Sequence, residues 1–310
     1  MNVVKFSIIH GLLIWGIVYN GTYLVLLAIF FASCFAIHFV LQAIFRTKLA
    51  RKILIVSNDE PNEPRSFFDV MVDHDPVENF VKNFNKDLPD DKKISTNLVA
   101  ILAFGRAVKK ANLDGKLVYD NFIKCDNVGI MMPVNVDGKN LVAAVARDCE
   151  SETFEGLRDK LKKKLHALKT DRDKDMNKQL KLLSSLPSFV IDIFFNISAY
   201  LSYNMNLSIP QLSVTKDHFG CAIVSNISGF TMYDCHGPFI HYTRNTIGSV
   251  ICPNRKVPVA KDGKIVIEKR AKIGMLSDVR VVSPVEEDLF SKELKRLWAN
   301  PELIVPSVKA

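Results

Sequence analysis

The sequence predicts an α+β domain built on a mixed sheet and preceded by a membrane-anchoring helical hairpin. Residues 53–310 alternate strand-like and helix-like segments, and Asp-Gly turn signals join several strands into hairpins. Residues 6–45 carry no charged side chain, so nearly all of the formal net charge of +8 lies beyond them. We therefore expect an anchor with its basic juxtamembrane segment at 1–52 and a globular domain at 53–310.

The uncharged run is too long for a single membrane crossing. As one helix it would measure about 60 Å, roughly twice the hydrocarbon thickness of a bilayer. Residues 19–22 (Tyr-Asn-Gly-Thr) form a turn signal between two apolar legs, 3–18 and 23–45. A cleaved signal peptide is the alternative, but its apolar region would span only about 7–15 residues. The pattern favours two membrane helices joined by a short turn.

A cluster of positive charges follows the second leg and orients the hairpin. Arg46, Lys48, Arg51 and Lys52 lie directly after the apolar run. Such clusters stay on the cytoplasmic side of a membrane, or on the matrix side in a mitochondrion. A hairpin places the N-terminus on that side too, and Lys5 agrees with this orientation.

The first half of the globular domain begins with strand-like segments and a strongly capped helix. Asp75-Pro76 is a typical helix start, and Ser95 or Thr96 can cap a longer helix that ends near Asn112. That helix is expected to bury one apolar stripe, made of Leu98, Ile101, Leu102, Gly105 and Val108. The expected elements are strands at 53–57 and 66–72, a helix at 75–84, a polar loop at 88–93 and the helix ending near 112.

The middle of the domain is expected to contain a hairpin and a charged helix. Asp114-Gly115 is a turn signal, and Asp137-Gly138 is typical of a tight hairpin connection. Apolar residues recur at helical spacing in the charged segment 151–168. The expected elements are strands at 116–119, 127–133 and 141–146 and a helix at 151–168.

The last part of the chain combines an apolar helix with further strands. Residues 184–206 show helical apolar spacing but carry too many polar side chains for a membrane span, so we expect a helix packed on the domain or at the membrane surface. Asp262-Gly263 signals another hairpin turn. The expected elements are strands at 211–215, 220–225, 245–251 and 264–269 and a final helix at 284–299.

The composition argues against nucleic acids, disulfides and metals. The positive charge shows no basic stripe with interleaved aromatic side chains, so nucleic-acid binding is not expected. The six cysteines are scattered without a C-x-x-C pair, which is typical of a reducing compartment. His218, Cys221, Cys235 and His236 are the one candidate metal set, but their spacing fits no common zinc site. Packed thiols are the favoured interpretation, and no metal is expected.

Four stretches in order resemble the catalytic domain of 2-oxo acid dehydrogenase acyltransferases, which have the chloramphenicol acetyltransferase-like fold. The segment Leu-Ser-Asp-Val-Arg-Val-Val-Ser-Pro at 276–284 is similar to the family motif "lsfDHRvvDG", and Cys-Ala-Ile-Val-Ser-Asn-Ile-Ser-Gly at 221–229 is similar to "ftiSNlG". The match spans roughly residues 65–305. The resemblance implies a mixed-sheet α+β sandwich, and it is carried by 94–112, by 127–134 with 141–148, by 220–229 and by 276–284.

The resemblance also implies that the family's catalytic histidine is missing. In the family, the histidine of the last motif is the general base of CoA-dependent acyl transfer. Val279 occupies that position here, Ser283 stands at the motif's aspartate and Pro284 at its glycine, while Asp278 and Arg280 are retained. Valine cannot accept a proton, and loss of a general base alone costs about 10²–10⁴ in rate. No catalytic residue is therefore expected in this motif.

Other residues bear on whether any activity survives. Ser225 stands at the family's serine, and the resemblance implies that it lines one pocket with Val279. His236 and His241 are candidates for a relocated base, although a hydrogen-bonded loop histidine is the simpler interpretation. No cofactor is expected, while CoA or acyl-CoA is the ligand that the resemblance allows.

Three functions remain open at this point. The first is a catalytically inactive, membrane-anchored structural or accessory subunit of a membrane protein assembly, with a mitochondrial respiratory complex of the inner membrane as the specific hypothesis. The second is an active membrane-bound CoA-dependent acyltransferase. The third is an acyl-CoA binding subunit. The expected partners are membrane protein subunits and the lipid bilayer, and the resemblance adds a homotrimer as an option.

Overall fold

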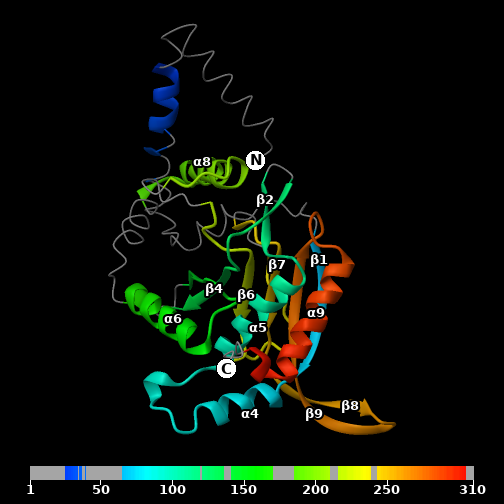
Figure 1. Ribbon diagram of the computed structural model, residues 1–310. Helices are drawn as coiled ribbons and strands as arrows, with labels where there is room; N and C mark the ends of the chain where they lie inside the picture. Colours follow the sequence, from blue (N-terminus) through cyan, green and yellow to red (C-terminus); the bar gives the residue numbers. More distant parts are fainter. Residues whose placement is uncertain are drawn as a thin grey trace. The chain divides into compact units, whose positions relative to one another are not determined.

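A computed structural model describes residues 25–33, 35, 36, 39, 65–118, 121–135, 141–169, 185–209, 216–238 and 243–304 (Figure 1). The chain divides into two compact units. One comprises Met1–Asn58 with Lys174–Tyr200, and the other comprises Asp59–Asp173 with Leu201–Ala310. The division expected at residue 52 stays a prediction.

In the first unit, a helical segment at residues 25–33 packs against helix α8 (Ser188–Ala199). The ring of Phe189 lies 5.9 Å from that of Phe31 and 6.3 Å from that of Phe35. None of the helices in the described part of the chain has the length and hydropathy that a bilayer crossing requires. The predicted turn at 19–22, the leg at 3–18 and most of the leg at 23–45 lie outside the described residues.

The helix predicted at 184–206 is shorter and less regular than expected. It begins at Ser188, directly after Pro187, whose extended conformation ends the preceding segment. From Tyr200 to Asn204 the chain continues as a π-helix, the element η2. The strands predicted at 53–57 and 211–215 lie outside the described residues.

The second unit contains a seven-stranded mixed sheet with the order β1-β9-β7-β6-β4-β5, in which β8 pairs with β9. β4, β6 and β7 run parallel to one another, and the remaining pairs are antiparallel. A separate hairpin joins β2 and β3. The strands are β1 (Arg65–Asp73), β2 (Gly115–Val118), β3 (Asn121–Lys124), β4 (Ile130–Asn135), β5 (Leu141–Ala146), β6 (Ala222–Asn226), β7 (Ile247–Ile251), β8 (Arg255–Lys261) and β9 (Lys264–Asp278).

A layer of helices covers one face of this sheet. The alternation along β1 distinguishes the two faces: Val70 and Val72 are buried, whereas Phe67 and Met71 are exposed. The helices are α4 (Asp75–Phe84), α5 (Thr96–Lys110), α6 (Phe154–Lys169) and α9 (Pro284–Ala299), with short 3₁₀ turns at Asp90–Lys92 and Pro301–Ile304. The predicted α+β architecture with a mixed sheet is therefore confirmed.

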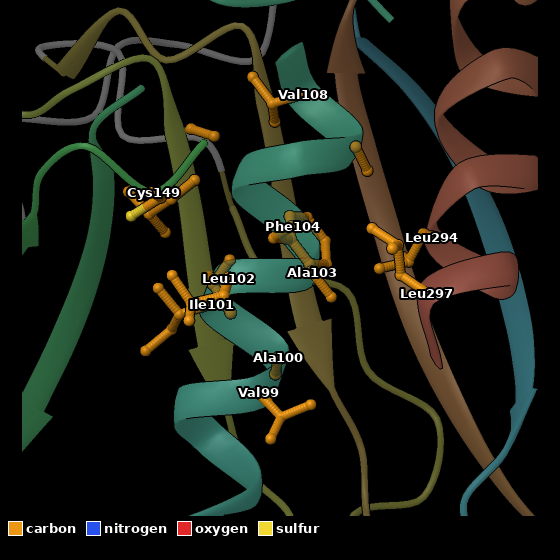
Figure 2. Close-up of a cluster of buried hydrophobic side chains, with 14 of the residues drawn as sticks. Val99, Ala100, Ile101, Leu102, Ala103, Phe104, Val108, Cys149, Leu294 and Leu297 are labelled. Carbon is orange, nitrogen blue, oxygen red and sulfur yellow. The ribbon is translucent and has the colours of Figure 1, made fainter. Parts of the chain in front are cut away.

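Helix α5 is the centre of the core. Ser95 is its N-cap, and its hydroxyl accepts from the Leu98 N–H at 3.4 Å. Figure 2 shows apolar side chains leaving α5 toward both the sheet and α9. The single buried stripe predicted for this helix was too narrow, because α5 lies between the sheet, α6 and α9 and is buried nearly all round. A Cβ on Gly105 would lie 2.3 Å from Cys149 Cβ, so only glycine permits this close approach.

Helix α9 starts and ends where the sequence predicts it to. Pro284 occupies its first turn, and the preceding Ser283 forms a capping box with Glu286. Its buried face includes Phe290, whose ring packs 5.1 Å from that of Phe104 on α5. Helix α9 therefore helps to hold helix α5 against the sheet.

The largest differences from the prediction concern strands. β9 continues to Asp278, well beyond the predicted end at 269, because the segment preceding the family-like motif is part of the strand. β3 and β8 were not predicted. β8 contains Pro258, which normally argues against a strand but is tolerated on an edge strand such as this one.

Candidate functional site

The histidine-equivalent position lies just beyond the end of β9, at the junction with α9. Val279 follows the last strand residue and is 50% exposed. The N–H groups of Val281 and Val282 donate to the Asp278 carbonyl at 3.0 and 2.9 Å, which closes a tight turn. An isopropyl group at this position has neither a proton to give nor a lone pair to accept one.

The two retained polar residues of this motif bind each other. Arg280 donates from Nε to Asp278 Oδ1 at 2.9 Å and from Nη2 to Oδ2 at 2.5 Å, a bidentate pair. The Arg280 backbone N–H also donates to Asp278 Oδ1 at 3.0 Å. Both side chains are therefore committed to holding the turn.

Ser283 and Pro284, at the positions of the family's aspartate and glycine, form the start of helix α9. The Glu286 carboxylate accepts from the Ser283 N–H at 2.9 Å and also from the Ser283 hydroxyl. This hydrogen bond from Ser283 lowers the pKa of Glu286. At the next residue of the helix, the Glu287 carboxylate accepts from Ser277 Oγ at 2.5 Å. Pro284 supplies the fixed φ that suits a first helical turn.

Ser225 lies too far from Val279 to share a pocket with it in one chain. Ser225 pairs with Val250, and Val250 pairs with Gly274 on β9. Asp278 is four residues further along β9, which corresponds to about 13 Å at the rise of a strand. The expected pocket of Ser225 and Val279 is therefore not formed within a single chain, because sheet register separates the two positions.

The first candidate for a relocated base, His236, does not lie at the β9–α9 junction. It lies beside Gly274, the β9 residue that is level with Ser225 across the sheet. Its Nε2 is 2.8 Å from Asp69 Oδ1, and Lys272 holds the other oxygen of Asp69 at 2.9 Å. Asp69 on β1 pairs with this same Gly274. The second candidate, His241, lies outside the described residues.

The segment before His236 crosses the sheet in close contact with it, on the face opposite helices α4, α5, α6 and α9. A Cβ on Gly274 would lie 2.2 Å from the Cys235 carbonyl oxygen and 3.1 Å from His236 Cδ2. Only glycine leaves room for the chain here. His236 and Asp69 therefore also tie this segment to the sheet, which is a structural role for the pair.

A second polar cluster surrounds the β2–β3 hairpin, and the sequence did not point to it. Lys116 on β2 is only 4% exposed, and its Nζ lies 5.7 Å from the centre of the Tyr203 ring. Nearby, Cys125 Sγ donates to Asp217 Oδ1 at 3.8 Å, and Asp217 forms a salt bridge with Arg147. Burial is the main cause that lowers the pKa of Lys116.

The five cysteines that the structure describes are free thiols, and the candidate metal set is not assembled among the described residues. Burial raises the pKa of Cys125 and of Cys149 to about 12, which keeps both protonated at neutral pH. Within the ranges that the structure describes, no group of three His, Cys, Asp or Glu side chains could hold a metal ion. Burial also lowers the pKa of His218, with Arg147 as the next cause.

Comparison with solved structures identifies the fold. A dihydrolipoamide acetyltransferase of Listeria monocytogenes matches with a TM-score of 0.58 and 15% identity, over 84% of this chain and 92% of that one. The cubic core of the pyruvate dehydrogenase multienzyme complex matches with a TM-score of 0.55 and 15% identity, over 85% and 90%. A truncated catalytic core of the 2-oxoacid dehydrogenase complex of Thermoplasma acidophilum matches with a TM-score of 0.54 and 11% identity, over 82% and 97%.

The likeness is one of fold. No family model matches the chain, and no curated protein matches it by sequence. At this level of identity the comparison establishes that the chain has the fold of 2-oxo acid dehydrogenase acyltransferase cores, and function must be argued from the site.

Proposed function

We propose that this chain is an acyltransferase-fold protein without acyltransferase chemistry, which serves as a membrane-anchored structural or accessory subunit of a membrane protein assembly. The observation that carries the proposal is the β9–α9 junction. Val279 stands where the base would be, and the polar groups around it bind one another: Arg280 binds Asp278, and Ser283 binds Glu286. The loop is organised as a helix start, with Val279 as its exposed apolar residue.

The proposal is tested by an acyl-transfer assay on the full-length protein in mild detergent. We expect no transfer from acetyl-CoA to dihydrolipoamide, to other thiols or to alcohols above the uncatalysed rate, because the position of the base is apolar. Catalytic turnover that saturates with acetyl-CoA would refute the proposal.

Restoring the family's motif by mutation distinguishes the loss of the histidine alone from a wider remodelling of the site. Val279→His alone is expected to stay inactive, because a catalytic histidine must also be oriented. The triple variant with Ser283→Asp and Pro284→Gly supplies the family's carboxylate and its flexible turn, and it is expected to exceed the single variant. Acyl transfer above the uncatalysed rate that is equally fast in the single and triple variants would show that only the histidine is missing.

The anchor belongs to the same proposal. The uncharged run at 6–45, the turn signal at 19–22 and the basic cluster that follows support a hairpin with both ends on one face, placed on the cytoplasmic or matrix side. We place the protein in the mitochondrial inner membrane, associated with a respiratory complex. Labelling of cysteines introduced at Asn2 and Asn58 in sealed vesicles tests the topology, since labelling from opposite faces is incompatible with a hairpin.

Partners are the second element of this proposal. Two of the similar structures are cores of multienzyme complexes, which supports a homotrimer as one arrangement for this chain. Purification in mild detergent, followed by mass spectrometry and native mass determination, distinguishes a trimer alone from a trimer with other membrane subunits. A monomer that co-purifies with no other protein would contradict the accessory role.

One observation favours a second candidate, an active membrane-bound acyltransferase with a relocated base. His236 is oriented by Asp69 at 2.8 Å, the kind of carboxylate contact that fixes the tautomer of a catalytic imidazole. If acyl transfer is detected, His236→Ala should abolish it and Asp69→Asn should reduce it by about 10²-fold or more. Activity that survives both substitutions would remove His236 as the base.

A further inference from the structure

Strand β8 and the first half of β9 form a two-stranded ribbon that projects from the sheet (Figure 1). β1 pairs with β9 only from Arg270 onward, and β7 only from Ile273 onward. Among the described strands, residues 264–269 of β9 therefore pair with β8 alone, and no other strand covers either edge of the ribbon. A ribbon of two strands is only marginally stable in water by itself, and open strand edges are usually protected. The ribbon is thus a surface that a partner would stabilise.

One face of this ribbon is apolar and exposed. Ile265 and Ile267 are two residues apart and therefore point to the same side, and their partners across the ribbon are Ala260 and Pro258. Ile265 is 79% exposed and Ile267 is 66% exposed, and no large apolar side chain in the described part of the chain is more exposed than Ile265. Further along the same face of β9, Ile273 is fully buried. The apolar face of β9 thus continues beyond the helices that cover its second half.

The ribbon is also strongly basic. Residues 255–270 contain six Lys and Arg and two Asp and Glu, and six less two gives a net charge of +4, against +8 for the whole chain. Four of the six cations form ion pairs: Arg255, Lys261, Lys269 and Arg270. Lys256 and Lys264 are exposed and form no ion pair with any described residue. The apolar face is therefore accompanied by positive charges that are available to an anionic partner.

The size and charge of the ribbon favour a lipid surface over a protein partner. Seven residue pairs form a face about 23 Å long and about 10 Å wide, or about 230 Å², whereas a stable protein interface buries about 800 Å² on each partner. Two copies that met through their ribbons would also bring together like charges. A bilayer with anionic lipids takes up a few apolar side chains at its interface and attracts the cations beside them. An exposed apolar strip with free lysines matches that chemistry.

The chain length before β1 allows the ribbon to reach the membrane that holds the proposed anchor. Arg65, the first residue of β1, pairs with Asp278, so the chain enters the sheet at the end of β9 away from the ribbon. Lys264 lies about 46 Å from Asp278 at the rise of a strand. Residues 46–64, between the uncharged run and β1, reach about 65 Å at full extension. The anchor and the ribbon can therefore contact one bilayer.

We propose that the β8–β9 ribbon docks on the anionic surface of the bilayer that holds the anchor. Ile265 and Ile267 enter the interfacial region, and Lys256 and Lys264 lie at the lipid phosphates. The presence of a bilayer beside the domain rests on the proposed function, whereas the affinity of the ribbon for anionic lipid rests on its own side chains.

Amide hydrogen exchange of the full-length protein tests this proposal. The protein is reconstituted into vesicles of phosphatidylcholine alone and into vesicles that also contain about 30% phosphatidylglycerol, and exchange is followed by mass spectrometry. We expect peptides from 255–270 to exchange at least about tenfold more slowly in the anionic vesicles, and about 0.5 M NaCl to weaken this protection. Peptides from α9 should not change. Equal exchange in the two vesicle types would overturn the proposal. Protection in detergent without lipid that grows with protein concentration would overturn it too, because a second copy would then cover the ribbon.

Variants of exposed residues identify the side chains responsible. The double variant Ile265→Ser with Ile267→Ser should lose the protection, and Lys256→Gln with Lys264→Gln should reduce it at least about threefold. Val285→Ser is the matched control, because Val285 is 66% exposed on α9, and it should keep the protection. Full protection in the double isoleucine variant would refute docking through this face.

Extraction of the vesicles at alkaline pH separates this proposal from the proposed function. A protein that resists extraction but shows no protection of the ribbon would refute only the docking. A protein that is extracted, yet whose ribbon is protected by anionic vesicles before extraction, would refute only the anchor.

Discussion

The β9–α9 junction and the surroundings of Lys116 lie at the same end of the sheet, and they treat polar groups in opposite ways. At the junction, Asp278 binds Arg280 and Ser283 binds Glu286. Around Lys116, the neighbouring Asp217 is paired with Arg147, and the amine has no hydrogen-bond partner among the described residues. The region that resembles a catalytic motif is thus organised for stability, whereas the region without a motif carries an energetic cost. Removing the lysine charge and breaking a pair at the junction should therefore change the stability of the protein in opposite directions.

The largest effect expected from this comparison is a gain of stability on removing the lysine charge. Lys116→Met keeps the aliphatic stem and removes the unpaired amine, so it should raise the free energy of unfolding by about 1–4 kcal/mol. Urea unfolding in mild detergent measures the change, and Lys264→Met on the exposed end of β9 is the control. A loss of stability in Lys116→Met would mean that the amine is satisfied in the folded protein.

Breaking an ion pair at the junction should lower the free energy of unfolding instead of raising it. Asp278→Asn leaves Arg280 without its carboxylate, and we expect a loss of about 1–3 kcal/mol, since Asp278 is largely buried and charged hydrogen bonds are the stronger ones. The exposed pair of Asp288 and Lys292 supplies the control, and Asp288→Asn should change little. Equal effects of the two substitutions would contradict a structural role for the junction.

The helix cap at the junction should contribute less. Ser283→Ala removes the hydroxyl of the capping box and should cost about 1 kcal/mol, measured as a lower midpoint of urea unfolding. Ser283→Asp should be close to the wild type, because aspartate also caps helices and is the residue that the resemblance places here. Two variants of equal stability would show that the cap does not contribute.

The smallest expected effect is a pH dependence of the free energy of unfolding that arises from Lys116. Its pKa is lower in the folded protein than its ordinary value of 10.5, so between these two values the unfolded chain binds more protons and stability rises with pH. The stability gain of Lys116→Met over the wild type should therefore shrink as the pH rises toward 10.5. Lys116 also lowers the pKa of Cys125, so both proteins are compared in a Cys125→Ala background, which removes that thiol. A gain that is independent of pH would show that Lys116 stays charged when folded.

Local patterns in the sequence were sufficient for much of the helical layer and for the motif positions. Asp75-Pro76 and Ser95 mark the starts of α4 and α5, and Ser283-Pro284 marks that of α9, because capping and the fixed φ of proline act over a few residues. Val279 could be placed at the histidine position from the order of its neighbours alone. Strands were harder, and β3 and the proline-containing β8 were missed because partners distant in sequence determine strand pairing.

The sequence by itself determined an α+β chain with a long uncharged N-terminal run, its principal helices and the residues at each position of the family-like motif. Only the tertiary structure decided which of these residues meet. Register across β6, β7 and β9 separates Ser225 from Val279, and the chain crossing Gly274 brings His236 to Asp69. The burial of Lys116 is likewise invisible in the sequence, where a lysine in a short strand suggests exposure. The physical reason is that pairing register and desolvation depend on segments far apart in the chain, whereas caps and turns depend on neighbours.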